Sequence, residues 1–151
     1  LNAAGIRSPG LTSAPAIADY AAELLAADGL DLTEKDSYID SREKVHFNRL
    51  SAAERKALIE KNPAYGRVIC RCETVTEGEI LDAIHSPIPP VSVDGIKRRT
   101  GAGMGRCQGG FCGPRVVDLL ARELGVSPLT ILQDRDGSEI LTAYTKGEVR
   151  A

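Results

Sequence analysis

Four cysteines, and only four, occur among the 151 residues of this chain, and they form two close pairs. Cys70 and Cys72 make a C-x-C pattern, and Cys107 and Cys112 make a C-x4-C pattern. Four thiolates that converge from two loops are the ligand set of a [2Fe–2S] cluster, which takes two thiolates per iron. The stretch between the pairs is long enough for two short helices that return the chain to the first loop. The spacing therefore predicts a cluster held by Cys70, Cys72, Cys107 and Cys112.

The residues around the second pair suit an anionic group. Gly109, Gly110 and Gly113 have no Cβ, so their backbone amides can come close to sulfur. Cys112 directly precedes a predicted helix, whose N-terminal end favours a thiolate. Cations lie nearby in the sequence, at Lys97, Arg98, Arg99 and Arg106.

Three other uses of the cysteines stay open at this stage. Structural zinc also binds four thiolates, but its usual pattern is C-x2-4-C on both sides, and here one spacing is tighter than that. Zinc is expected mainly as a substitute in overexpressed protein, because it binds thiolates well. Disulfides need an oxidising compartment, which nothing in the sequence indicates. Thiol–disulfide catalysis would not explain two pairs.

Bulk properties exclude several classes of protein. The net charge of −2 gives no overall field that would attract nucleic acid, so no nucleic-acid partner is expected. No apolar run approaches the roughly 20 residues of a membrane span, so we expect a cytoplasmic protein with at most peripheral contact with a membrane. The chain begins with Leu1 in a segment typical of a protein interior. We therefore expect the C-terminal part of a larger protein.

The apolar pattern predicts a mainly α fold with short helices. A helix capped by Ser13 should run through Leu25 and stop at Gly29. Two capping boxes, Ser51 to Glu54 and Thr76 to Glu79, predict helices that begin just after Ser51 and Thr76. Further helices are expected near Ile96, from Gly113 to Leu124, and as a short turn at Ser127 and Pro128.

These elements suggest three regions. Residues 1–50 hold one helix and an extended connector, too little to bury a core alone. Residues 51–132 form a helical unit around the cysteines. Residues 133–151 are a polar tail whose apolar pair, Ile140 and Leu141, could lie in a strand that pairs with a partner outside this chain.

The cysteine region resembles a known family. Its motifs are Ile69-Cys70-Arg-Cys72-Glu73, Thr76-Glu77-Gly78-Glu79-Ile80, and Gly105-Arg-Cys107-Gln-Gly-Gly-Phe-Cys112-Gly-Pro114. Together they resemble the [2Fe–2S] domain of the bacterioferritin-associated-ferredoxin type over about residues 65–125. The resemblance implies a small helical domain that holds its cluster with the four cysteines.

A second resemblance concerns residues 5–17. Their sequence is similar to the end of the flavin domain in FAD-dependent dehydrogenases of the anaerobic glycerol-3-phosphate dehydrogenase and L-2-hydroxyglutarate dehydrogenase type. The resemblance implies flavin contacts at Gly5, Ile6, Ser8, Gly10, Leu11 and Thr12. A glycine-rich loop that leads into a helix N-terminus suits the negative charge of a reduced flavin. The structural alternative is simply a loop and a capped helix.

Taken together, the resemblances imply the iron–sulfur electron-transfer module of a flavin-dependent dehydrogenase. Electrons would pass from reduced FAD to a quinone or protein acceptor, and the substrate would be glycerol 3-phosphate or a similar 2-hydroxy compound. The flavin domain that precedes this chain is an expected partner, and FAD would be held only in the longer protein. The chain alone lacks a substrate pocket and should not be catalytic; a homo-oligomer is a further expectation. The alternative from another class is a docking domain stabilised by zinc or a cluster, without a redox role.

Overall fold

The computed structural model describes residues 1–38, 41 and 43–146. It divides into two compact units, Leu1–Glu43 and Lys44–Ala151, which we describe separately. The expected mainly α fold is confirmed, since strand is limited to one short hairpin in the part of the chain described. Residues 39, 40 and 42 of the predicted connector, and residues 147–151 of the predicted tail, lie outside the described residues.

The N-terminal unit contains one helix, α1, Gly10–Ala27. The prediction that Ser13 caps this helix is wrong, because the helix begins three residues earlier and Pro9 is the cap residue. The carbonyl of Pro9 accepts both the amide of Ser13, at 3.1 Å, and the hydroxyl of Thr12, at 2.8 Å, so the first turn closes upstream of the predicted cap. Pro15 therefore lies inside the helix, where it removes a single amide donor. The predicted stop at Gly29 is confirmed by its left-handed backbone, with φ +92°.

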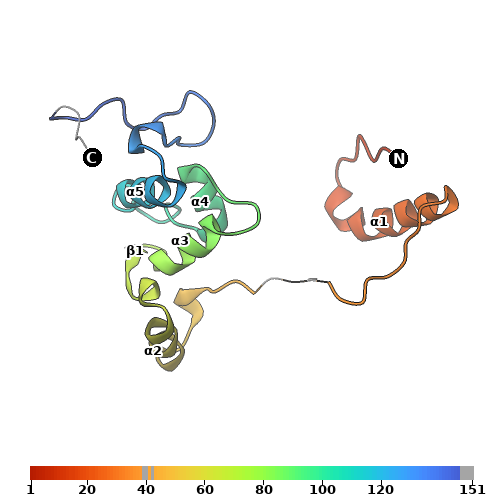
Figure 1. Cartoon of the computed structure of the whole chain (residues 1–151), viewed down its shortest axis with the longest axis horizontal. Coiled ribbons are helices and arrows are strands. Elements are labelled where there is room, and N and C mark those ends of the chain that lie inside the picture. Colours follow the sequence, from red (N-terminus) through yellow and green to blue (C-terminus); the bar gives the residue numbers. More distant parts are fainter. Residues whose placement is uncertain (39–40, 42, 147–151) are drawn as a thin grey trace. The chain divides into compact units, whose positions relative to one another are not determined.

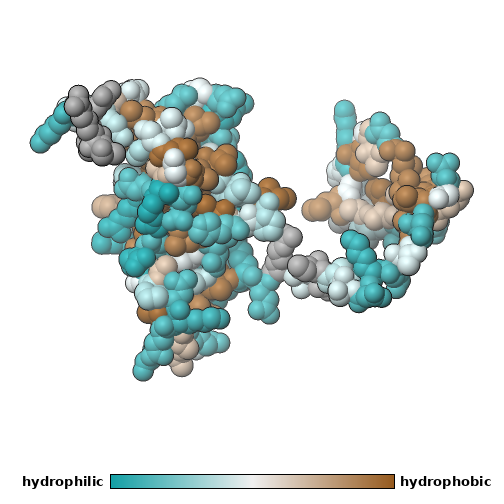
Figure 2. Space-filling view, viewed as in Figure 1, coloured by the Kyte–Doolittle hydropathy of each residue, from teal (hydrophilic) through white to brown (hydrophobic). Residues whose placement is uncertain are grey.

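None of the residues of α1 is buried within its own unit. Leu11 is 91% exposed and Tyr20 63%, and the apolar surface over this helix is visible in Figure 2. Although α1 has 18 residues, neither it nor any other helix in the described residues is long and apolar enough to cross a bilayer. The helix thus presents an apolar surface that its own unit leaves uncovered.

The second unit is built from short elements (Figure 1). In chain order they are the 3-10 turn Phe47–Arg49, α2 Ala52–Lys61, the 3-10 turn Pro63–Gly66, β1 Val68–Cys70, β2 Val75–Thr76, α3 Glu77–Ile84, α4 Val93–Thr100, α5 Gly113–Leu124 and the 3-10 turn Pro128–Thr130. Helix α3 packs against α4 and α5, and α4 packs against α5. The fully buried side chains of this core include Ile80, Ile96, Leu120 and Ile131, and also Cys70 and Cys112.

Local capping sets the helix boundaries as the sequence predicts. Both capping boxes form, with Ser51 and Glu54 at α2 and Thr76 and Glu79 at α3. Ser92 caps α4, and Gly125 ends α5 with φ +66°. Each of these residues supplies a hydrogen-bond partner or a backbone conformation that a helix end needs.

The first cysteine pair lies on a hairpin. Strands β1 and β2 are antiparallel and are joined by residues 71–74. Tyr65 lies buried in the 3-10 turn before β1. Its ring packs so closely on Gly78 that a Cβ there would lie 2.6 Å from a ring carbon. Its hydroxyl donates a hydrogen bond to Asp82, which fixes α3 behind the hairpin.

The connector ends in an anchored segment. Phe47 is 6% exposed, and its amide donates to Oε1 of Glu79 on α3 at 3.1 Å. Arg55 of α2 donates to the Phe47 carbonyl at 3.1 Å. The side chain of Asn48 donates to the carbonyl of Glu73, inside the hairpin loop, at 3.3 Å. The end of the predicted extended connector is therefore part of the second unit.

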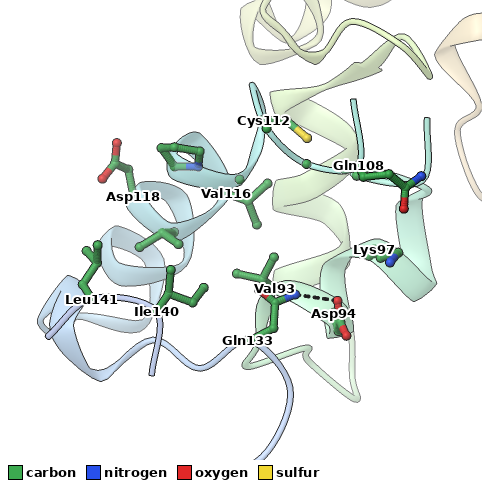
Figure 3. Close-up of a pocket in the computed structure, with 17 residues that line it drawn as sticks. Val93, Asp94, Lys97, Gln108, Cys112, Val116, Asp118, Gln133, Ile140 and Leu141 are labelled. Carbon is green, nitrogen blue, oxygen red and sulfur yellow. Dashed lines mark hydrogen bonds between the residues drawn. The ribbon is translucent and has the colours of Figure 1, made fainter. Parts of the chain in front are cut away.

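The C-terminal tail pairs with this same unit. Leu132 bridges Ser92 in parallel and Glu139 in antiparallel orientation, and the Gln133 amide donates to the Ser138 carbonyl at 2.7 Å. Ile140 and Leu141 then lie beside α5 (Figure 3). In the described residues Ile140 and Leu141 do not form a strand, and pairing of this segment with a partner outside the chain stays a prediction. The turn from Asp134 to Ser138 folds the chain back onto its own residue 132.

An ion network joins Arg67, just before β1, to α3 and α5. The side chain of Glu77, 7% exposed, accepts hydrogen bonds from Arg67 and, at 3.0 Å, from Arg122. Arg122 also contacts Glu123, which pairs with His85 at 2.9 Å. The Arg67 hydrogen bond, outweighing the effect of burial, and the contacts with Arg122 lower the pKa of Glu77.

Because the pKa of Glu77 is lowered by folding, its contribution to stability is present above the ordinary carboxyl range and is lost as the pH falls through the lowered value. Glu77→Gln is expected to reduce the free energy of unfolding by about 1–3 kcal/mol at neutral pH. The difference in the free energy of unfolding between this variant and the parent should shrink below about pH 4. Urea unfolding across pH measures this. Glu60→Gln is the control, because Glu60 is exposed and its pair with Lys56 spans 3.9 Å; equal effects of the two variants would contradict the prediction.

Candidate metal centre

The four cysteines come from two loops at one end of the helical core. Cys70 ends β1, Cys72 lies in the hairpin turn, and Cys107 follows the glycine-rich loop after α4. Cys112 is the residue immediately before α5, as predicted. Cys70 and Cys112 are each 1% exposed, whereas Cys107 is half-buried and Cys72 is exposed. All four are free, so the disulfide alternative is not what this structure contains.

The thiols pair across the two loops. The Cys107 thiol lies close enough to Cys72, and the Cys112 thiol close enough to Cys70, for each partner to shift its pKa. In the described residues, no three Cys, His, Asp or Glu side chains surround a single metal position. Two separate pairs, one buried and one at the surface, suit two irons with two thiolates each better than one tetrahedral zinc with four.

The electrostatics of the two pairs differ. The backbone amide of Phe111, the Cys72 thiol and the amides of Gly109 and Gly110 lower the pKa of Cys107. Burial, followed by the effect of Cys70, raises the pKa of Cys112 to about 11. The surface side of the site therefore already carries amide donors directed at sulfur, and the buried side needs a bound cation to hold a thiolate.

Glycines shape the second loop. Two of the three predicted glycine amides, those of Gly109 and Gly110, do contact a cysteine sulfur. Gly113 lies instead in the first turn of α5, with open space where a Cβ would be. Gly105 has a role that the sequence did not reveal. A Cβ at this residue would overlap Cys72 and lie 2.8 Å from Oε1 of Glu73.

The sequence also did not predict two unusual backbone conformations near the cysteines. Thr74, with φ +53°, and Gln108, with φ +50°, are the non-glycine residues of the described chain in the left-handed region, and each follows a cysteine closely. The Gln108 side chain donates to the carbonyls of Met104 at 3.0 Å and Gly105 at 2.9 Å. Such conformations persist where surrounding contacts impose them and are common at functional sites. No sequence signal distinguishes them from ordinary loop residues.

The predicted cations are only partly at the site. Arg98 pairs with Asp134 at 2.5 Å, and Arg99 donates to the carbonyl of Ile88 at 2.7 Å. These two residues hold neighbouring segments against α4 rather than supporting the cysteines. Arg106, next to Cys107, is exposed.

A cavity of about 370 Å³ lies beside Cys112 (Figure 3). Its wall combines the second cysteine loop with side chains of α4, α5 and the tail, among them Val93, Lys97, Val116, Ile140 and Leu141. Gln133 also lines the cavity, and its side-chain amide donates a hydrogen bond to Asp94 at 2.8 Å. The tail thus covers one side of the α4 and α5 surface next to the buried thiol pair.

The residues predicted to contact flavin lie in the N-terminal unit. Gly5 has φ +70°, and Ile6 and Ser8 precede the helix. Gly10, Leu11 and Thr12 form the first turn of α1, where backbone amides lack acceptors within a helix. Ile6, Ser8, Gly10, Leu11 and Thr12 line a shallow hollow together with their neighbours. Their flavin contacts stay a prediction.

Comparison with known proteins agrees with the cysteine geometry. Residues 68–122 match the model of the BFD-like [2Fe-2S] binding domain. The chain is 49% identical, over 99% of its length, to a glycerol 3-phosphate dehydrogenase of Caloramator mitchellensis, of which it spans 32%. It is 38% identical over 56% of its length to the hydrogen cyanide synthase subunit HcnB of Pseudomonas aeruginosa, spanning 20% of that protein.

An anaerobic glycerol-3-phosphate dehydrogenase polypeptide of Escherichia coli K12 is 36% identical over 44% of this chain, which spans 12% of that polypeptide. The chain therefore spans about a third or less of these relatives. No solved structure matches it.

Proposed function

Residues 68–122 belong to the family of BFD-like [2Fe-2S] binding domains, and from this premise we propose that the chain is the electron-transfer module of a flavin-dependent dehydrogenase. The observation that carries the proposal is the arrangement of the thiols as two pairs, Cys70 with Cys112 and Cys72 with Cys107. Each pair would hold one iron. The buried pair and the surface pair together give the site an inner side and an outer side.

A bound [2Fe–2S] cluster supplies one-electron redox chemistry. The chain contributes the surroundings that make such chemistry reversible. The amides of Gly109, Gly110 and Phe111 donate toward Cys107 and stabilise negative charge on sulfur. The core around Cys70 and Cys112 excludes water from the inner side. Gln108 closes the loop and keeps the amides aligned.

Metal analysis tests this function directly. The full chain, reconstituted anaerobically, is expected to bind about two irons and two sulfides, with a visible absorbance that bleaches on reduction. Cys72→Ser should lose this absorbance, and Ser37→Ala, in the other unit, should not. Stoichiometric zinc without iron uptake would contradict the proposal and favour the docking-domain alternative.

The relatives support a more specific role. Two are named as glycerol 3-phosphate dehydrogenases, so we propose glycerol 3-phosphate or a similar 2-hydroxy compound as the substrate of the whole protein. FAD held by the preceding flavin domain would take a hydride from substrate, and the cluster domain would pass electrons singly to a quinone or protein acceptor. In this proposal Gly5, Ile6, Ser8, Gly10, Leu11 and Thr12 face the flavin.

The uncovered surface of α1 gives a test of this larger protein. We expect amide exchange over residues 13–27 to be fast, or the chain to self-associate, because no residue of α1 is buried. Exchange over residues 114–124 should be slow, because α5 contributes Val116, Leu119 and Leu120 to the core. Adding the preceding region of the longer protein should slow exchange in α1 and confer FAD binding. A monomer with equally slow exchange in both helices would contradict this prediction.

A further inference from the structure

The thiol site has one side open to solvent. Cys70 and Cys112 are 1% exposed, but Cys72 is exposed and Cys107 half-buried. Electron tunnelling weakens steeply with distance, so electrons exchange with an outside partner most readily at the Cys72 and Cys107 side. The residues beside these two thiols therefore decide which partner can approach.

Two large apolar side chains are exposed beside the open side. The chain has two phenylalanines, and whereas Phe47 is buried, Phe111 is 75% exposed. The amide of Phe111 lies close to Cys107, so its backbone lies against the half-buried thiol of the open side. Met104, in the loop closed by Gln108, is 50% exposed. Exposed apolar residues next to a functional site are typical of a docking surface.

Two exposed cations flank the cysteines in the sequence. Arg71 lies between Cys70 and Cys72, Arg106 directly precedes Cys107, and both are exposed. Among the described residues, neither forms an ion pair. The only carboxylate in the hairpin turn, Glu73, is half-buried. The positive charge is local, because the whole chain has a net charge of −2.

We propose that Met104, Phe111, Arg71 and Arg106, here called the cluster-edge surface, bind an electron-carrier protein whose own surface has an apolar centre ringed by carboxylates. The proposal rests on the proposed electron-transfer function. The bound cluster would supply one electron in each encounter, and the partner's one-electron centre, a haem or a flavin, would accept it. No covalent bond changes and no proton moves. Complementary charge speeds the encounter, and the apolar pair holds the two redox centres close.

The test uses the cluster-loaded full chain, reduced with dithionite, and two protein oxidants of opposite charge. Acidic cytochrome b5 and basic cytochrome c are mixed with it in a stopped-flow instrument at increasing salt. The rate with cytochrome b5 should fall as salt rises, whereas the rate with cytochrome c should rise or stay level. Arg71→Glu with Arg106→Glu should lower the cytochrome b5 rate about tenfold or more at low salt. Phe111→Ser should lower that rate while leaving its salt dependence unchanged.

Control variants distinguish an effect of the cluster-edge surface from an effect of the overall charge of the chain. Lys56→Glu with Lys61→Glu makes the same charge change on α2 and should leave both rates close to those of the parent. If the Glu variants assemble no cluster, Arg71→Gln with Arg106→Gln replaces them. Rates that respond equally to both pairs of substitutions would overturn the proposal. So would binding of phosphatidylserine vesicles that is lost with Arg71 and Arg106, because it would assign the surface to a membrane.

The two proposals fail in different ways. A chain that takes up no iron, or whose absorbance does not bleach on reduction, contradicts the proposed function itself. A chain that assembles and cycles its cluster, but whose rates ignore Arg71, Arg106 and Phe111, overturns only the assignment of the cluster-edge surface.

Discussion

Replacing Cys107 by serine is expected to cause a large fall in the melting temperature of the metal-loaded chain. Cys107 lies beside Cys72, so its loss would leave one of the proposed irons a ligand short. The unit is small, and its core includes Cys70 and Cys112, which the proposed cluster would link to the other two cysteines. Metal binding in small domains contributes about 10 kcal/mol or more to folding in the best-studied zinc sites, so a large part of the stability should be lost.

Calorimetry and iron content, measured under anaerobic conditions, check this result. Ser86→Ala is a useful control, because Ser86 is half-buried and its hydroxyl donates to the nearby carbonyl of Ile88, at 3.1 Å. A Cys107→Ser variant that melts with the parent, whatever its iron content, would show that the helices are stable without the metal.

The second large effect is expected from Gly105→Ala. The added methyl would overlap Cys72 and lie 3.3 Å from its sulfur and 2.8 Å from Oε1 of Glu73. A side-chain rotation cannot relieve a clash with the Cβ of Cys72, so the hairpin turn must move away from the glycine loop. Overpacking of this kind typically costs about 1–3 kcal/mol. Because the displaced residue, Cys72, is a proposed iron ligand, cluster content should fall as well as stability.

Gly113→Ala is the matched control for this variant. Gly113 lies one residue after Cys112, yet no atom lies within 4 Å of a Cβ built there. It occupies the first turn of α5, where alanine is well tolerated. Iron content and melting temperature of the two variants are compared side by side. Equal loss in both, or no loss in Gly105→Ala, would contradict the geometry described for this loop.

Local signals made much of this fold predictable. The capping boxes that begin at Ser51 and Thr76 act within one turn of the chain, so the sequence alone places these two helix starts. The start of α1 was misplaced because the carbonyl of Pro9 accepts the amide of Ser13 and closes a turn upstream of the predicted cap.

The features that the sequence did not predict depend on contacts between residues that are far apart in the sequence. The pairing of Leu132 with Ser92 joins residues 40 positions apart, and no local pattern records it. The same holds for the contact of Asn48 with Glu73 and for the steric need for glycine at 105. The cysteine spacing predicted a two-loop site, but only the fold shows which thiols lie together and which side faces solvent.

The placement of Cys70 and Cys112 inside the hydrophobic core has a consequence for the lifetime of the protein in the cell. In most proteins a lost prosthetic group leaves behind an intact, inactive chain. Here the side chains proposed as ligands are also core residues, so a chain without iron is expected also to be poorly folded and to open to proteases. Iron supply would then set the abundance of this protein as well as its activity, and inactive copies would be removed rather than accumulate.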